Sequence, residues 1–377
     1  MSLVYVPSRS ASAAAASLYR GMFTDADYAR QRAFFSDSVR FPSTPLHELT
    51  HLAASLGLGR LWLKDETDRF GLPSFKGLGT MFALQTLQES GALRGVRALV
   101  CASEGNHGRA VAHAARRAGV KCRVYLGEQV AGARADAIRS EGAEVVRVAG
   151  TYDEAVRRAA ADAAQHGWHV ISDTSWPGYE EIPRQIMLGY TRMLDEAEQQ
   201  WGADGPPDLM AVQGGVGGLV GAAASWLAWR YREGRPKLVV VEPARAACIQ
   251  AAARAGRVVA LDSPLTTIMG GLRCGEMSPV AFRVIDAVAS AYMAIEDEWT
   301  RAAMRRLAQP AKSDPRLVVG PSGAAGVAAL LAMRAASGTA RLLETAHGRV
   351  PTVVVIATEG ATEPALWEKV TGSPSEP

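Results

Sequence analysis

Short runs rich in β-branched residues alternate with longer alanine-rich stretches, and this alternation restricts the fold more than any other feature of the sequence. Runs of roughly four to eight such residues are typical of buried strands, and the stretches between them have the spacing of amphipathic helices. Strand, helix, strand units build parallel sheets because a helix must return the chain to the same edge. The sequence therefore predicts an α/β protein.

The strand-like runs fall into two series, separated by a break-rich stretch, GADGPP, at residues 202–207. The first series comprises residues 99–103, 122–127, 144–149 and 169–173, with helical segments such as 109–117 and 152–165 between them. The second series comprises residues 209–213, 238–241 and 352–357. We expect each series to form its own sheet. The run RLWLKD at residues 60–65 precedes the first series, and periodicity alone does not assign it to either sheet.

Charge and composition exclude several classes of protein. The 41 basic and 38 acidic residues leave a net charge of +3 and are spread along the chain, so no basic face for nucleic acid is expected. Apolar stretches end before the roughly 18 to 20 residues of a bilayer span, and the N-terminus lacks the pattern of a secretory signal. The four cysteines lack the spacing of a metal site. We expect a cytoplasmic protein without a metal, nucleic-acid or membrane partner.

A single lysine stands where a turn-rich segment meets a helical pattern. In the segment KDETDRFGLPSFK, Lys76 would lie just inside a helix N-terminus. The positive end of the helix and partial burial would lower the pKa of Lys76 and make its amine a nucleophile. Taken alone, a solvated surface lysine is the better interpretation, because most lysines are exposed.

A loop with the sequence SEGNHG follows one strand-like run and precedes a helical segment. Loops at the carboxyl ends of parallel strands are where α/β proteins bind ligands. Gly105 would let a ligand approach the backbone, Asn106 offers a donor and an acceptor, and Glu104 supplies a carboxylate for proton transfer. A helix N-terminus capped by Ser103 or Asn106 explains the same residues.

A glycine-rich segment, GGVGG at residues 214–218, lies between a strand-like run and a convincing helix. Successive backbone amides at a helix start form an anion cradle that suits one phosphate group. The segment lacks the Lys-Ser or Lys-Thr ending of a triphosphate loop and the spaced GxGxxG of a dinucleotide fold. It therefore favours a monophosphate, although a tight strand-to-helix turn also uses glycine.

Together these three segments match the needs of pyridoxal 5'-phosphate, which has an aldehyde, a ring and one phosphate. Their order, SFK, SEGNHG and GGVGG, resembles that of the fold type II pyridoxal-phosphate enzymes, the tryptophan synthase β and threonine dehydratase group. Within that group, residues 41–365 resemble the diaminopropionate ammonia-lyases. The specific blocks are SDTSWPGYEEIP and GLRCGE, and FPSTPL, PSGAAG and ATEGATEP occur in the same order.

The resemblance implies two three-layer α/β domains, each with a mostly parallel sheet, and a cofactor in the cleft between them. Residues 1–85 plus 205–377 would form the large cofactor-binding domain, and residues 86–204 a small domain inserted within it. Relatives are commonly dimers, so we also expect a homodimer.

The resemblance further implies which residues hold the cofactor. Lys76 would form the internal Schiff base, with Phe75 beside it, and Asn106 would hydrogen-bond the phenolic oxygen. Thr358 would face the pyridine nitrogen, where a neutral hydroxyl tempers the electron sink. The phosphate would be held by Gly214, Gly215, Val216, Gly217 and Gly218.

The substrate would lie against the SEGNHG loop and the SDTSW segment. Substrate-binding residues implied by the resemblance are Ser103, Gly105, His107 and Asp173. Asp173 matches a family carboxylate used for the L isomer, and capping of the turn after its strand is its alternative role. Glu104 stands where the family usually has the aspartate base for the D isomer. Its carboxylate is one methylene longer, so acceptance of D substrate stays open.

The implied reaction is α,β-elimination of 2,3-diaminopropionate, a small-molecule amino acid, to pyruvate and ammonia. Two alternatives share the scaffold: a serine or threonine dehydratase-like enzyme, and a β-replacement enzyme. A third, of another class, is a non-catalytic amino-acid-binding protein. Cys248 and Cys274 fall where family members carry cysteines near the active-site entrance. We expect free thiols, with a disulfide as the alternative.

Overall fold

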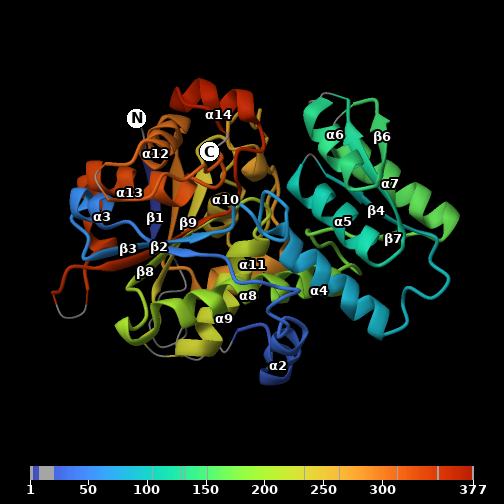
Figure 1. Cartoon of the computed structure of the whole chain (residues 1–377), viewed down its shortest axis with the longest axis horizontal. Helices are drawn as coiled ribbons and strands as arrows, with labels where there is room; N and C mark the ends of the chain where they lie inside the picture. Colours follow the sequence, from blue (N-terminus) through green and yellow to red (C-terminus); the bar gives the residue numbers. More distant parts are fainter. Residues whose placement is uncertain are drawn as a thin grey trace.

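Two separate sheets, each with its own helices, organise the molecule, and Figure 1 shows them side by side. Both sheets are mostly parallel, so the predicted α/β class is confirmed. Within the part of the chain that is described, no helix combines the length and apolar character needed to cross a membrane. The computed structural model describes residues 3–7, 21–103, 105–128, 130, 132–150, 152–232, 234–262, 264–311, 313–345 and 348–375.

The larger sheet has seven strands, and only the two edge strands, β1 and β2, run antiparallel to their neighbours. The run at residues 60–65 is β3 of this sheet and pairs in parallel with β11. In spatial order the strands are β1 (Leu3–Pro7), β10 (Ala291–Ile295), β9 (Lys237–Pro243), β8 (Leu209–Gln213), β11 (Thr352–Ala357), β3 (Arg60–Asp65) and β2 (Leu46–Glu48).

Alternate residues of the central strands bury themselves on opposite faces of this sheet. In β8, Met210 and Val212 join one apolar cluster, whereas Leu209 and Ala211 join another. This period of two makes both faces apolar, as expected when helices cover both. One face is covered by α2 (Asp25–Phe34), α4 (Lys76–Glu89), α8 (Glu181–Trp201), α9 (Gly218–Tyr231), α10 (Cys248–Ala255) and α11 (Pro279–Val288). The other is covered by α3 (Thr50–Leu56), α12 (Asp297–Ala308), α13 (Ala325–Ala335) and α14 (Pro364–Thr371).

The smaller sheet has four parallel strands. In spatial order they are β6 (Glu144–Val148), β5 (Lys121–Gly127), β4 (Ala98–Ala102) and β7 (His169–Val170). Its helices are α5 (Asn106–Arg117), α6 (Gly132–Ser140) and α7 (Tyr152–His166). The face that carries α5 and α6 belongs to the same apolar cluster as α4 and α8, so one core runs through both halves.

The packing of α8 bears on where the small domain ends. We propose a large domain built on the seven-stranded sheet and a small domain built on the four-stranded one, as the expected division at residues 86–204 implies. However, α8 packs against α2, α9 and β2, which belong to the large sheet or its layers. We therefore place α8 in the large domain, so the proposed small domain ends before residue 181.

A buried charge network fixes the turn that leads into α4. Arg69 donates from Nε to Glu66 at 2.8 Å and from a terminal nitrogen to Glu196 of α8 at 2.7 Å. Lys64 of β3 also pairs with Glu196, at 3.0 Å, and all four side chains are almost completely buried. Burial would lower the pKa of Arg69, but the two carboxylates raise it well above its usual range. The network therefore ties β3, the turn and α8 together.

Replacing Arg69 by Met should destabilise the protein strongly, because it leaves two buried carboxylates without their main partner. We expect the free energy of unfolding to fall by about 3–5 kcal/mol, measured by urea denaturation followed by tryptophan fluorescence. Arg139→Met is the matched control, since Arg139 pairs with Asp136 on the exposed face of α6. It should change the free energy of unfolding by about 0–1 kcal/mol. Equal effects of the two substitutions would contradict a stabilising role for the network.

Candidate active site

A cavity of about 1290 Å³ lies between the two sheets. Its walls include the segments that follow β4 and β7 in the small sheet and β8 and β11 in the large sheet. The carboxyl ends of parallel strands place their loops at one edge of a sheet, so both sheets present loops to this space. Every described residue that was predicted to bind the cofactor or the substrate lines the cavity, except Gly217.

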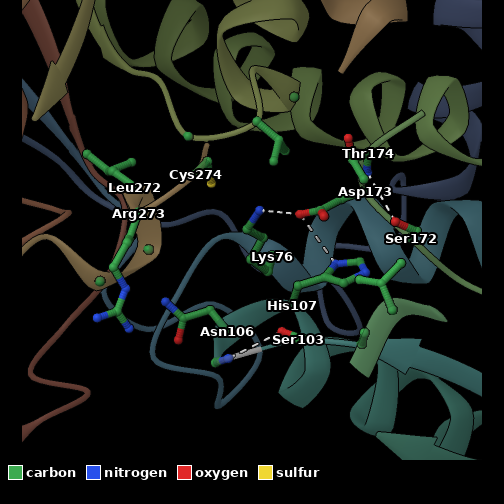
Figure 2. Close-up of a pocket in the computed structure, with 18 of the residues that line it drawn as sticks. Lys76, Ser103, Asn106, His107, Ser172, Asp173, Thr174, Leu272, Arg273 and Cys274 are labelled. Atoms are coloured by element: carbon green, nitrogen blue, oxygen red, sulfur yellow. Dashed lines mark hydrogen bonds and ion pairs between the residues drawn. The ribbon is translucent and has the colours of Figure 1, made fainter. Parts of the chain in front are cut away.

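Lys76 and Asp173 form an ion pair inside the cavity. Lys76 is the first residue of α4, as predicted, and its Nζ lies 2.6 Å from Oδ2 of Asp173 (Figure 2). The two side chains are only 20% and 14% exposed. His107 lies near the same oxygen, with Nδ1 at 3.6 Å from Oδ2 of Asp173. The amine of Lys76, the carboxylate of Asp173 and the imidazole of His107 are thus neighbours in the cavity.

The pKa of Lys76 departs from the prediction. Burial lowers it, as expected, but the negative charge of Asp173 and the hydrogen bond between the two groups outweigh burial and raise it. The expectation of a lowered pKa is therefore wrong. The same pair acts on Asp173: burial opposes its ionisation, yet His107 and Lys76 hold its pKa well below its usual range. Sequence reasoning missed this effect because the partner is 97 residues away in the chain.

The SEGNHG loop lines the cavity, and the N-cap of α5 is Gly105, not Ser103 or Asn106 as the capping alternative expected. Oγ of Ser103 accepts hydrogen bonds from the amides of Gly105, at 3.2 Å, and Gly108, at 2.8 Å, so Ser103 holds the loop against α5. Asn106 and His107, the first residues of α5, both line the cavity. His107 bonds the carbonyl of Ile171 through Nε2, at 3.0 Å, and this contact orients its ring. Glu104 lies outside the described residues.

The GGVGG segment turns sharply between β8 and α9. Gly215 and Gly217 have φ values of 64° and 96°, a region that L residues with side chains rarely adopt. Gly217 precedes α9, and no side chain caps the first amides of that helix. The amides and the positive end of α9 are therefore available to an anion. Of the five predicted residues, Gly214, Gly215, Val216 and Gly218 line the cavity.

Gly217 does not line the cavity, because its open side faces α11. A Cβ placed on Gly217 would lie 3.2 Å from the side chains of Ala281 and Ile285. Its requirement for glycine therefore comes from the positive φ and from this close packing.

Thr358 closes the cavity at the end of β11. Its side chain is buried, and its hydroxyl accepts a hydrogen bond from Nε2 of Gln213 at 3.3 Å. Phe75, also predicted, precedes Lys76 and packs edge-on against Tyr190 of α8, with ring centroids 4.7 Å apart. Phe75 and Thr358 are joined through the backbone, since the amide of Phe75 donates to the carbonyl of Thr358.

Two residues of the site were not predicted from the sequence. Glu359 follows Thr358, lines the cavity and accepts a hydrogen bond from Nδ2 of Asn106 at 2.6 Å. Glu359 belongs to the block ATEGATEP, but the resemblance implied a role only for Thr358 of that block. Tyr190 is fully buried, and the Nζ of Lys76 lies 5.7 Å from its ring centroid. It belongs to a long amphipathic helix, where an aromatic residue looks like ordinary core.

All four cysteines are free thiols, in agreement with the preferred expectation. Cys248 is buried and donates from Sγ to the carbonyl of Gly215 at 3.4 Å. Burial raises the pKa of its thiol well above the usual range. Cys274 lines the cavity, and its Sγ would lie 3.9 Å from a Cβ placed on Gly215.

The cavity suits pyridoxal 5'-phosphate. The turn before α9, the glycine cradle, needs glycine, since a Cβ on Gly214 would lie 2.7 Å from the side chain of Glu242 and one on Gly215 would lie 3.3 Å from the carbonyl of Gly271. The backbone amides of this turn, which no side chain caps, suit a phosphate. The Lys76 amine, a hydroxyl and an amide side chain line the same space. These groups match the aldehyde, ring nitrogen and phenolic oxygen of the cofactor.

The comparison with known proteins agrees with this interpretation. Residues 40–362 match the family of pyridoxal-phosphate dependent enzymes. Diaminopropionate ammonia-lyase of Escherichia coli strain K12 is 34% identical over 366 residues, which cover 93% of this chain and 92% of that protein. The enzyme of the same name from Salmonella typhimurium strain LT2 is 34% identical and covers 90% of both chains.

Solved structures give the same result. The crystal structure of the Escherichia coli enzyme, in complex with an aminoacrylate-PLP azomethine reaction intermediate, matches this fold with a TM-score of 0.88. The match covers 98% of this chain and 97% of that chain, at 32% sequence identity. The fold type II architecture expected from the motifs is thereby confirmed. The chain belongs to the diaminopropionate ammonia-lyases, within the pyridoxal-phosphate dependent enzymes.

Proposed function

We propose that this protein is an ammonia-lyase that converts 2,3-diaminopropionate and water to pyruvate and two molecules of ammonia. The main observation behind the proposal is the ion pair between Lys76 and Asp173. The pair lies in a cavity that is also lined by Asn106, Thr358 and the glycine cradle. When bound, pyridoxal 5'-phosphate supplies an electron sink for the bond to the α carbon of an amino acid. The chain itself must then hold the substrate and move protons.

Each group of the site has a distinct proposed role. Lys76 would hold the cofactor covalently, and residues 214–218 would hold its phosphate at the start of α9. Asn106 would donate to the phenolic oxygen, and the neutral hydroxyl of Thr358 would face the ring nitrogen. Ser103, Gly105 and His107 would receive the substrate on the small-domain side, and the contact of His107 with Ile171 keeps its ring in place.

Proton abstraction at the α carbon needs a base within hydrogen-bond reach. Asp173 remains ionised at neutral pH because His107 and Lys76 lower its pKa, and it lies 2.6 Å from Nζ of Lys76. We propose that Lys76 and Asp173 handle the proton of the L isomer. We propose Glu104 as the base for the D isomer; the Escherichia coli relative has been crystallised in complex with D-serine.

A substrate panel tests the proposed reaction. With L- and D-2,3-diaminopropionate, L- and D-serine and L-threonine, kcat/KM should favour a diaminopropionate isomer by roughly tenfold or more. Two ammonia molecules should appear per pyruvate, because both amino groups leave, whereas serine can release only one. A preference for serine or threonine would indicate a dehydratase instead. If an added nucleophile suppresses the release of pyruvate, the enzyme catalyses β-replacement. If no substrate is turned over, the protein is a binding protein.

Lys76→Ala is the control variant for this panel. It should lose both the visible absorption of the bound cofactor and the turnover of every substrate, because no other amine replaces the covalent attachment. Lys121→Ala, at an exposed position at the start of β5, should keep both. Retention of turnover in Lys76→Ala would contradict the assignment of this lysine.

Cofactor incorporation should depend on pH through the Lys76 and Asp173 pair. Lys76 must lose a proton before its nitrogen can attack an aldehyde, and Asp173 raises its pKa. In Asp173→Asn burial remains while the opposing charge is gone, so the pKa of Lys76 should fall. The test is the rate at which cofactor-free protein incorporates pyridoxal 5'-phosphate, measured by absorbance at each pH from 6 to 9. The increase of this rate with pH should begin at a lower pH in Asp173→Asn than in the wild type. Coincident curves would show that Asp173 does not control this amine.

We further propose that the protein acts in the cytoplasm as a homodimer. Four free thiols support a reducing compartment. Analytical ultracentrifugation of the holoenzyme should give twice the mass of one chain across micromolar concentrations. A single species with the mass of one chain would contradict the dimer.

A further inference from the structure

Glu359 is a buried carboxyl in the cavity wall whose two oxygens have different partners. Oε1 accepts from the backbone amide of Ser322 at 3.0 Å, and Oε2 accepts from Nδ2 of Asn106 at 2.6 Å. The residue is 5% exposed and comes from the large domain, whereas Asn106 begins α5 of the small domain. The contact to Asn106 therefore joins the two halves of the cavity.

The chemistry of the two side chains fixes how Asn106 is oriented. An ionised carboxylate only accepts hydrogen bonds, so it must face the NH₂ group of Asn106 and not the carbonyl. That NH₂ group has two hydrogens, and Glu359 takes one of them. The second N–H remains for another acceptor in the cavity. Without a carboxylate at this position, nothing in these contacts distinguishes the two orientations of the amide.

We propose that Glu359 is a positioning residue that orients the amide of Asn106. In this orientation, the second N–H of Asn106 donates to the phenolic oxygen of pyridoxal 5'-phosphate. The inference rests on the proposed function. A donor at that oxygen favours its ionised form. Glu359 thereby acts on the cofactor through Asn106 and without touching it. Burial raises the pKa of Glu359, and the hydrogen bonds with Ser322 and Asn106, together with the charge of Arg134, oppose that rise.

The simpler role for Glu359 is to fix the turn before α13 through its bond to Ser322. That role predicts a loss of stability and no change in the cofactor. The two roles separate in Glu359→Gln, which keeps the size of the side chain. The Gln oxygen can still accept from Ser322, while its NH₂ group can donate to the carbonyl of Asn106, so the amide of Asn106 is free to reverse.

The test is a double-mutant cycle of Glu359→Gln and Asn106→Ala, read through the bound cofactor. In Glu359→Gln, the pH midpoint of the visible absorption band should rise by roughly half to one unit, and the Kd for pyridoxal 5'-phosphate by about 5- to 30-fold. Asn106→Ala should produce the same shift of midpoint. The double variant should match Asn106→Ala alone, because the effect passes through Asn106.

Asp195→Asn is the matched control for burial. Asp195 is a buried carboxylate of α8 that accepts from Arg32 and Trp226, and it does not line the cavity. It should lower the melting temperature and leave the absorption midpoint unchanged. A Glu359→Gln variant with only a lower melting temperature, or additive shifts in the double variant, would overturn the proposal. A wild type that binds no cofactor would instead overturn the proposed function.

Discussion

The close crossing of α4 and α8 determines where the Lys76 amine can lie. A Cβ on Gly79 would come within 2.7 Å of the carbonyl of Ile186, and one on Gly189 within 2.7 Å of the carbonyl of Leu78. Only glycine at both positions lets the two backbones approach this closely. Because α4 also packs against α5, the same helix joins the core of both sheets. A lysine at its first residue therefore points into the space between them.

Much of this arrangement could be predicted because parallel strands leave little freedom. The loops after β4 and β8 were identified from the strand and helix pattern alone, and their meeting in one cavity follows from the two-sheet fold. Strands β1, β2 and β10 were not predicted. Two are edge strands that pair with one neighbour only, and β10 reads AYMAI, which has a single β-branched residue, Ile295. The cluster at Arg69 was also missed, because its members become neighbours only after folding.

The position of Lys76 at a helix N-terminus does not predict the direction of its pKa shift. A helix N-terminus and burial both act to lower the pKa of an amine, and the sequence displays both. A carboxylate in direct contact acts in the opposite direction and is stronger at short range, because the Coulomb energy of a buried pair exceeds that of a helix end. The net direction of the pKa shift therefore depends on how close Asp173 lies to Lys76. A local sequence pattern does not encode that distance.

Two of the carboxyl groups that line the cavity, Asp173 and Glu359, have different surroundings, and the difference suits them to different roles. Asp173 faces the cationic group of Lys76 and the ring of His107, so its pKa is low and it can accept a proton at neutral pH. Burial raises the pKa of Glu359, and both of its oxygens already accept hydrogen bonds. The contacts with Ser322 and Asn106 hold the carboxyl of Glu359 in one position in the cavity wall. These surroundings are consistent with the proposed roles, in which Asp173 takes part in proton transfer and Glu359 orients Asn106.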